Sequence, residues 1–232
     1  GDLRMGRTKN HNGDYFGERP TYVETINGVD VLVENSNKYL QKQSGFKQYN
    51  FMQKIAYKSQ KEFEHGLNFQ FSNSSDIPRY DRLTDASSTG LKSAEWFYGP
   101  QKRVLAVYSL SKKKAFLASD FKLDVAYQNI EESRHDRKFG NYNLQNRNEK
   151  VNMYSISIDL HKTFDTSELF YGIESYIEDL NSSAYSNNIN TGEIKPIDSR
   201  YPNGKNNMLR NDIYVSYNTI FSKKTNFNIG GR

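Results

Sequence analysis

Cysteine is absent from this chain of 232 residues, which excludes disulfide bonds and thiolate metal sites. Long apolar runs are also missing: no stretch approaches the roughly 18 consecutive apolar residues that a membrane-spanning helix needs. The histidines are few and far apart in the sequence, with no zinc-type spacing, at His11, His65, His135 and His161. We therefore expect no metal site, no cofactor and no spanning helix, although the strands of a membrane β-barrel carry a much weaker signal than a helix does.

A strong excess of one charge is lacking as well. The 32 Lys and Arg residues against 27 Asp and Glu give a net charge of +5. The longest basic run, Lys112–Lys114, is typical of a solvated turn. A nucleic-acid partner is therefore not expected.

Apolar residues are scarce but aromatic residues are not. The hydrophobic share is 35%, while 17 Tyr and 14 Phe bring the aromatic share to 14%, and the mean hydropathy is −0.87. Disordered chains are poor in aromatic residues, so this polarity is not simply disorder. A structure with one narrow apolar face and one wet face would give this mixture.

Strict alternation of apolar and polar residues is the strongest signal, and it indicates β-strands. It runs through Phe46–Lys58 and Glu62–Ser74, through five further segments, and into an eighth that begins at Phe227. The apolar positions of the five segments are Val104, Ala106, Tyr108 and Leu110; Phe121, Leu123, Val125 and Tyr127; Tyr154, Ile156, Ile158 and Leu160; Leu169, Tyr171, Ile173 and Ile177; and Ile213, Val215, Tyr217 and Phe221.

The links between these segments alternate in length. The short links are Ser59–Lys61, Ser111–Ala115, His161–Ser167 and Ser222–Thr225. The long ones are Ser75–Pro100, Glu131–Asn148 and Asp179–Met208, with Gly6–Gly45 as a further candidate. Tight turns at one end and long loops at the other are the pattern of an outer-membrane barrel. The fold class predicted is all-β: an antiparallel up-and-down meander of seven or eight strands, forming part of a larger transmembrane β-barrel.

The alternative is a soluble β-sandwich, which has the same two-residue period. Sandwich strands are usually about 5–6 residues long, and the segments here are longer. Charged residues at mid-strand (Lys54, Asp124 and Asp212) suit a wet lumen, and aromatic residues near the strand ends suit interfacial girdles.

The barrel interpretation assigns side chains to two faces. Those expected to point away from the barrel axis are Phe51, Ile55, Phe69, Leu123, Val125, Ile156, Ile158, Val215 and Tyr217. Those expected to point toward it are Lys54, Gln70, Lys122, Asp124, Ser157, Asp212 and Ser216.

Three segments resemble sequences of TonB-dependent outer-membrane receptors: Asp76–Thr84 (DIPRYDRLT), Ala94–Gln101 (AEWFYGPQ) and Ala126–Phe139 (AYQNIEESRHDRKF). The resemblance implies a twenty-two-stranded barrel with an N-terminal plug. It also implies import of a scarce nutrient across the outer membrane of a Gram-negative bacterium. Residues 1–232 would be a central part of the barrel domain, without plug, signal peptide or barrel closure. The expected partners are outer-membrane lipid, a small nutrient ligand, and the TonB energising complex, which would engage an N-terminal region outside this segment.

The resemblance leaves the nutrient open among siderophore-bound iron, haem, cobalamin and oligosaccharide. No enzyme activity is expected. Two alternatives stay open: an outer-membrane barrel enzyme of the protease or lipase type, and a soluble β-rich binding module.

The segment Asp76–Thr84 contains three candidate ligand contacts: Arg79, Tyr80 and Arg82. An arginine pair can bind carboxylate or phosphate groups bidentately. The competing interpretation, which we favour, is an ion-pair knot of these arginines with Asp76 and Asp81.

Trp96 and Tyr98 are further candidates, since their rings could stack on a flat ligand or, more commonly, anchor at the outer leaflet. Arg134 and His135 complete the set, within the charge cluster Glu131–Lys138. A catalytic relay of Ser133, His135 and Asp136 is geometrically poor, because adjacent residues of an extended chain point to opposite sides.

Overall fold

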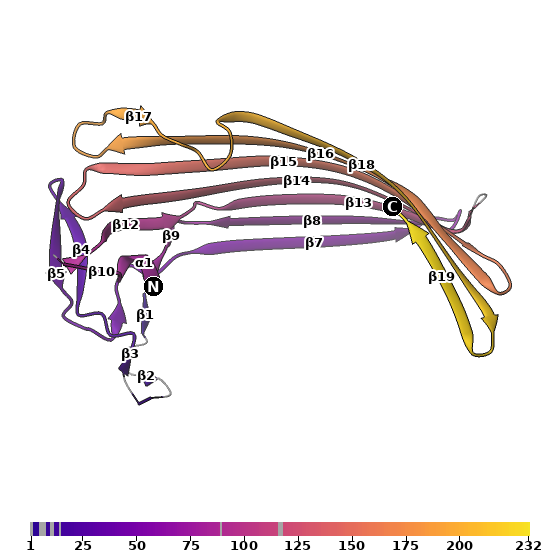
Figure 1. Ribbon diagram of the computed structural model, residues 1–232, viewed down its shortest axis with the longest axis horizontal. Helices are drawn as coiled ribbons and strands as arrows, with labels where there is room; N and C mark the ends of the chain where they lie inside the picture. Colours follow the sequence, from indigo (N-terminus) through magenta and orange to yellow (C-terminus); the bar gives the residue numbers. More distant parts are fainter. Residues whose placement is uncertain (1, 5–7, 10–11, 14, 89, 116–117) are drawn as a thin grey trace.

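The computed structural model describes residues 2–4, 8–9, 12–13, 15–88, 90–115 and 118–232. Eight long antiparallel strands form one sheet in the order β19-β18-β16-β15-β14-β13-β8-β7, so each strand pairs with the long strand before it (Figure 1). They are β7 (Gln48–Lys58), β8 (Phe63–Ser74), β13 (Lys102–Ala115), β14 (Ala118–Lys138), β15 (Asn143–Thr163), β16 (Ser167–Asn188), β18 (Gly204–Ser222) and β19 (Thr225–Gly231). The predicted all-β antiparallel meander is confirmed.

Short elements gather at the end of the sheet that carries residues 75–101, 139–142 and 189–203, here called the long-loop end (Figure 1). They are β9 (Ile77–Pro78), α1 (Tyr80–Leu83), β10 (Ala86–Ser87), β11 (Gly90–Leu91), β12 (Ser93–Tyr98) and β17 (Ile194–Pro196). The N-terminal segment adds β1 (Leu3–Arg4), β2 (Thr8–Lys9), β3 (Tyr15–Phe16), β4 (Thr21–Ile26), β5 (Val29–Glu34) and β6 (Leu40–Gln41). Within the described residues, no helix is long and apolar enough to cross a membrane.

Two of the predicted long loops are wrong. Most of Glu131–Asn148 is strand, because β14 runs to Lys138 and β15 resumes at Asn143. Likewise, β16 covers the first part of Asp179–Met208, and β18 begins at Gly204. The alternation of apolar residues stops in both segments, but the backbone ladder continues through pairs such as His135 with Asn146, whose side chains are hydrogen-bonded. Polar side chains that bond across strands support strand structure without any apolar pattern.

The segment Ser75–Pro100 also contains more strand than predicted. Strand β9 pairs with β12. Strand β12 pairs with residues 134–138 of β14, beyond Lys102, the first residue of β13. Strands β8 and β13 are thus extended by β9 and β12 after an interruption around Gly99. The predicted link Gly6–Gly45 contains the hairpin of β4 and β5, and Gly6 lies outside the described residues.

The short links fall at the opposite end, here called the short-turn end. The turns 59–62, 164–166 and 223–224 agree with the prediction. Strand β13, however, continues through the predicted link Ser111–Ala115, and residues 116–117 lie outside the described residues.

The register divides the side chains into two faces. Val125 lies opposite Ile156, and Ile158 lies opposite Ile173, which lies opposite Ile213. Residues directly opposite each other in a ladder share a face, so this apolar face continues across the strands. Asp124 lies opposite Ser157 on the other side, here called the polar face. The predicted grouping of residues into two sets is confirmed.

The apolar face is not covered by a second layer. The exposed fractions are 41% for Val125 and 50% for Val215, and large apolar side chains of every other long strand except β13 are exposed to a similar extent. A β-sandwich would bury this face against another sheet. The described residues therefore do not form the two-layer core that the soluble alternative requires.

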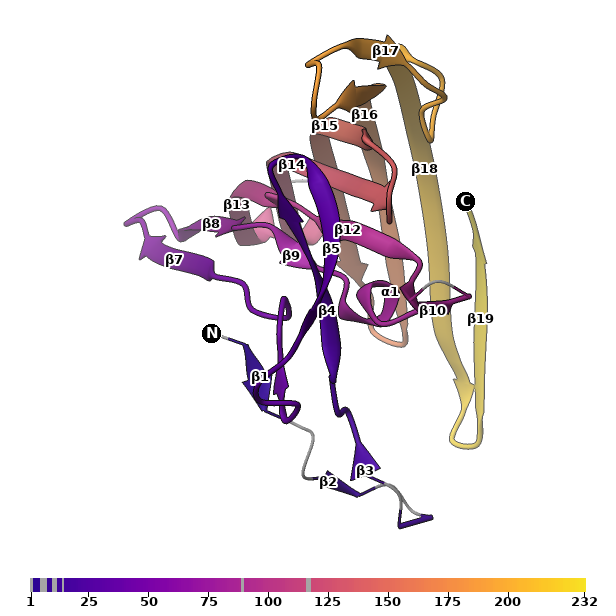
Figure 2. The same ribbon diagram turned by 90° about the vertical axis from the view of Figure 1, so that its left-hand side faces the viewer.

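The sheet is curved but not closed. Figure 2 shows the long strands following an arc from β7 round to β19, with α1 on its hollow side. Strands β7 and β19 each have one neighbour in the sheet. The pairing leaves two free sheet edges in the part of the chain that the structure describes, and no closed barrel.

Tyr214 packs over a glycine on the polar face. It lies opposite Gly172, and its hydroxyl donates a 2.6 Å hydrogen bond to an Asp159 oxygen one strand further on. A Cβ on Gly172 would meet the Ile158 carbonyl oxygen at 2.4 Å and the Tyr214 ring at 2.6 Å. The ring thus fills the space left by the glycine and joins β15, β16 and β18.

Replacing Gly172 by alanine should destabilise the protein by about 1–3 kcal/mol, because the new methyl group has no room beside backbone atoms. Gly66→Ala is the matched control, since its Cβ would meet Ser109 at an ordinary 3.5 Å. Urea unfolding of both variants under the same solvent conditions measures the difference. Equal midpoints for the two variants would contradict the packing described for Tyr214.

Candidate functional site

Arg79 is the centre of a cluster that joins two of the predicted loop segments. Its guanidinium lies 4.9 Å from the Trp96 ring centroid and donates a 3.0 Å hydrogen bond to the Tyr98 hydroxyl. It is also 3.1 Å from Asp81, and this hydrogen bond raises the pKa of Arg79. The two rings meet edge to face at 5.0 Å. The structure therefore brings together Arg79, Trp96 and Tyr98.

The cluster stands on the polar face. Trp96 lies opposite Asp136 and Tyr98 lies opposite Arg134, so all four side chains share that face. Alternation along β14 places Arg134 and Asp136 with Asp124 rather than with Val125. Arg134 has a buried Nε atom with no hydrogen-bond partner among the described residues. The predicted site residue Arg134 is thus next to the cluster and has an unused donor.

Arg82 belongs to an ion-pair group on the exposed side of α1. It lies 3.2 Å from Asp85 and 3.8 Å from Asp81. The expected ion-pair knot is present around Asp81, but Asp85 takes the place that the sequence assigned to Asp76. The cause is local. Arg82 and Asp85 are three residues apart at the C-terminal end of α1, and a helical turn brings side chains at this spacing to the same side.

Tyr80 turns away from the Arg79 cluster and packs under Arg19, whose guanidinium lies 4.9 Å from the ring centroid. Burial raises the pKa of Tyr80, and Arg19 opposes the rise. Arg19 is itself buried. Its side chain donates hydrogen bonds to the Gln43 side chain at 3.0 Å and to the Thr21 carbonyl oxygen at 3.4 Å, and its buried Nη1 atom has no partner among the described residues. Tyr80 is therefore a contact between α1 and the N-terminal segment.

His135 lies on the opposite face from the Arg79 cluster. Its ring stacks on Phe97 at 4.6 Å, and one ring nitrogen is 2.6 Å from the Asn146 side-chain oxygen. Asp136 points to the other face and pairs with Arg147 at 3.2 Å. The structure does not bring His135 together with the other site residues, and it separates His135 from Asp136 as alternation requires.

No group of three or more His, Asp or Glu side chains able to hold a metal ion is found among the described residues. His65 and His161 make hydrogen bonds to Tyr108 and Asp120 at 2.9 and 3.0 Å. His11 lies outside the described residues.

The N-terminal hairpin is fixed to the sheet by a buried ion pair that the sequence did not reveal. Arg137 and Asp30 are each 1% exposed and lie 2.8 Å apart. Arg137 also reaches Glu95 at 2.7 Å and Thr25 at 2.8 Å, and the Gly140 N–H donates to Asp30 at 2.8 Å. Hairpin β4–β5 therefore lies across the long-loop end beside the candidate site (Figure 1).

A polar hollow lies further down the polar face. It has a volume of about 590 Å³ and is rich in side-chain amides, including Gln48, Asn50, Gln70 and Gln128. Arg103 donates a 2.9 Å hydrogen bond to Gln128 there. The lining offers many neutral donors and acceptors, together with two cations, Lys102 and Arg103, and two carboxylates, Glu131 and Glu132.

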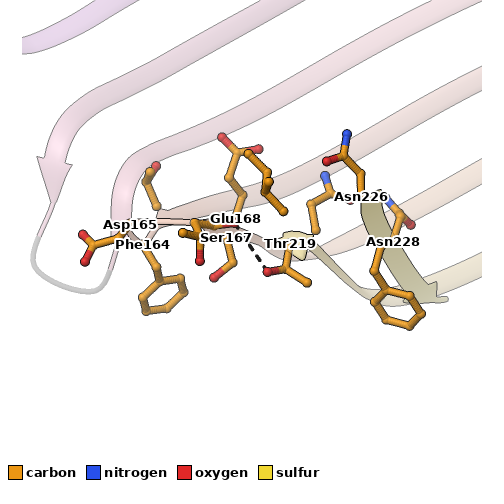
Figure 3. Close-up of a pocket in the computed structure, with 12 residues that line it drawn as sticks. Phe164, Asp165, Ser167, Glu168, Thr219, Asn226 and Asn228 are labelled. Carbon is orange, nitrogen blue, oxygen red and sulfur yellow. Dashed lines mark hydrogen bonds between the residues drawn. The ribbon is translucent and has the colours of Figure 1, made fainter. Parts of the chain in front are cut away.

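A second hollow, of about 500 Å³, lies at the short-turn end (Figure 3). It is lined by the turn between β15 and β16 and by parts of β18 and β19. Asp165 and Glu168 lie on one side of it, and Asn226 and Asn228 lie on the other. It is at the other end of the sheet from the predicted site residues and contains none of them.

Comparison of the chain with models of protein families and with curated protein sequences found no match.

Acidification should release the N-terminal hairpin. Burial alone would raise the pKa of Asp30, but hydrogen bonds from Arg137, Thr25 and Gly140 outweigh it and lower that pKa. A lowered carboxyl pKa adds stability above the unfolded value, about 3.9, and this stability is lost as the pH falls through the folded value. The protection factors of the β4 and β5 amides against hydrogen exchange should therefore fall below about pH 4.

Asp30→Asn should produce the same release at neutral pH. It breaks the buried Arg137–Asp30 pair and leaves Arg137 paired with Glu95 alone, at a cost of up to about 3–5 kcal/mol. Glu193→Gln is the control, because its pair with Lys195 is exposed and such pairs contribute about 0–1 kcal/mol. Unchanged hairpin exchange in Asp30→Asn would show that the pair does not fix the hairpin.

Proposed function

We propose that this chain is part of the wall of a transmembrane β-barrel in the outer membrane of a Gram-negative bacterium. The complete protein, on this proposal, is a TonB-dependent receptor that imports a small nutrient. It performs no bond chemistry: the long-loop end recognises the ligand, and the TonB complex supplies the energy through a region outside residues 1–232.

One observation carries the proposal: the apolar face extends across the long strands and remains exposed. Apolar side chains facing outward and polar side chains facing a wet interior are what a barrel wall in lipid requires. In water, an exposed apolar area this large would be a site of aggregation or association. Hydrocarbon is the one surrounding in which such a face needs no protein cover.

The length and curvature of the sheet also support the proposal. Strands of 19 to 22 residues, such as β14, β15, β16 and β18, exceed the about 9–11 residues needed to cross a bilayer. Their excess length lies at the long-loop end, where the alternating apolar pattern stops. A receptor barrel uses such extensions to carry its loops away from the membrane.

The Arg79 cluster supports a ligand-contact role for this end. Arg79 and Arg134 supply cationic donors, and Trp96 and Tyr98 supply aromatic surface, all on the face that would border the lumen. A ligand with anionic and flat parts fits this combination.

The enzyme alternative is poorly supported. Acid–base or nucleophilic catalysis needs side chains within hydrogen-bond reach of each other. His135 instead bonds to Asn146, and Asp136 bonds to Arg147 on the other face.

An arginine scan tests the membrane assignment. Ile156→Arg should cost about 2–4 kcal/mol in the assembled barrel, because it places a charge on the lipid face. Ser157→Arg is the matched control: it makes the same change one residue along, on the polar face opposite Asp124. The measurement is the free energy of unfolding from lipid vesicles, together with the yield in the membrane fraction. Equal tolerance of arginine at both positions would exclude the proposed lipid face.

Alanine substitutions at Arg79, Arg82, Trp96 and Tyr98 test the ligand mouth. Arg79, Trp96 and Tyr98 form one cluster, so we expect each of these three changes to weaken nutrient binding per folded molecule by about tenfold, as for loss of one charge-assisted contact. Arg82→Ala is the internal control, since the acids with which Arg82 pairs, Asp81 and Asp85, lie on the exposed side of α1. Affinity is measured by titration and normalised to correctly assembled barrel. Unchanged normalised affinity in all four variants would leave the cluster with a structural role only.

A further inference from the structure

A hollow of about 330 Å³ opens on the apolar side of the sheet at the long-loop end, beyond the last apolar residues. Two rows of the ladder, two residues apart along each strand, line it. One row is Lys102, Glu131, Lys150 and Asn181; the other is Ser133, Asn148 and Ser183.

The register places both rows on the same face as the apolar side chains. Along β14, Tyr127, Glu131 and Ser133 alternate with residues of the polar face, and along β15 Tyr154 shares its face with Lys150. The Tyr127 and Tyr154 rings meet at 5.1 Å. Lys150 is four positions from Tyr154 along the strand, or about 13 Å. The hollow thus lies just outside an aromatic pair, at the height of lipid headgroups.

The charge of the lining is positive on this face. Glu131 lies 2.8 Å from Lys150 and 3.8 Å from Lys102, so two lysines flank one carboxylate. Lys205 extends the same row, opposite Asn181. Glu132 and Glu149 also border the hollow, but they lie opposite each other in the row between, and alternation directs their side chains to the polar face.

Ser133 provides an unused polar group. It is 8% exposed, and its hydroxyl has no hydrogen-bond partner among the described residues. A buried hydroxyl without a partner normally costs free energy, which suggests that a ligand or solvent oxygen satisfies it. Asn148, Asn181 and Ser183 add neutral donors around it.

We propose that this hollow binds a phosphate group of an outer-leaflet membrane lipid. The phosphate contacts the Lys102 and Lys150 ammonium groups beside the Glu131 carboxylate that they flank, and it accepts a hydrogen bond from the Ser133 hydroxyl. The acyl chains extend down the apolar face past Tyr127 and Tyr154. The inference rests on the proposed membrane location and adds a lipid-specific site to it. Lysine suits the task because a compact ammonium group binds phosphate as a point charge.

The experiment uses the complete protein, reconstituted in phosphatidylcholine vesicles that contain either bisphosphorylated lipid A or its dephosphorylated form. Insertion is scored first, by flotation of the vesicles. Lipid A retained by the protein is then measured by native mass spectrometry. Retention of the phosphorylated form alone is the expected result for the unaltered protein.

The double variant Lys102→Gln/Lys150→Gln should lose about 25-fold in affinity for the phosphorylated lipid, at about fivefold per lysine. Lys112→Gln/Lys162→Gln is the matched control, with one change in each of the same two strands at the short-turn end. Lys102→Arg/Lys150→Arg should keep the phosphate bound. Ser133→Ala should lose about twofold to tenfold, as for one hydrogen bond.

Equal retention by the Lys102→Gln/Lys150→Gln variant and the control would overturn the proposal. So would equal retention of the dephosphorylated lipid. Competition by inorganic phosphate at similar affinity would identify a soluble-anion site instead. Failure of the unaltered protein to insert would overturn the proposed function itself, and flotation separates this outcome from loss of the lipid site alone.

Discussion

The backbone ladder between long antiparallel strands is the constraint on which the rest of the structure depends. Because side chains alternate with a period of two, one register decides both faces of the sheet at once. The pairing that sets Val125 beside Ile156 also sets Asp124 beside Ser157. A slip of one residue in β15 would move polar side chains onto the apolar face, so the apolar pattern holds the register in place.

Beyond the apolar face, polar contacts take over the same task. The Arg137–Asp30 pair joins hairpin β4–β5 to β14, and the stacking of His135 on Phe97 joins β14 to β12. These contacts replace apolar packing where strands extend past the alternating region. Buried ion pairs are costly to break rather than strongly stabilising to form, which makes them suited to fixing one arrangement of a surface loop.

The two faces lead to two kinds of recognition on one sheet. On the polar face, Arg79, Trp96, Tyr98 and Arg134 gather around the proposed lumen. On the apolar side, Lys102, Lys150 and Ser133 form the proposed lipid-phosphate site. Both lie at the long-loop end, and a single layer of strands separates them. The proposed nutrient and lipid sites therefore share β14, whose alternate residues point to each.

By itself, the sequence determined the strands, their order and the two faces, because a period of two is a local property that each strand displays in its own residues. It also located Arg79, Trp96 and Tyr98 in the loops, without showing that they meet. It misplaced the ends of β14, β15 and β16, because polar strand pairs leave no apolar pattern. Only the tertiary structure decided that Arg137 reaches Asp30, because that pair depends on which distant residues the register and the chain path bring within hydrogen-bond distance, and no local pattern encodes that. The pairing of Arg82 with Asp85 and the opposite orientations of Arg134 and His135 have local causes, a helical turn and an extended strand, in segments that the sequence interpretation placed in loops.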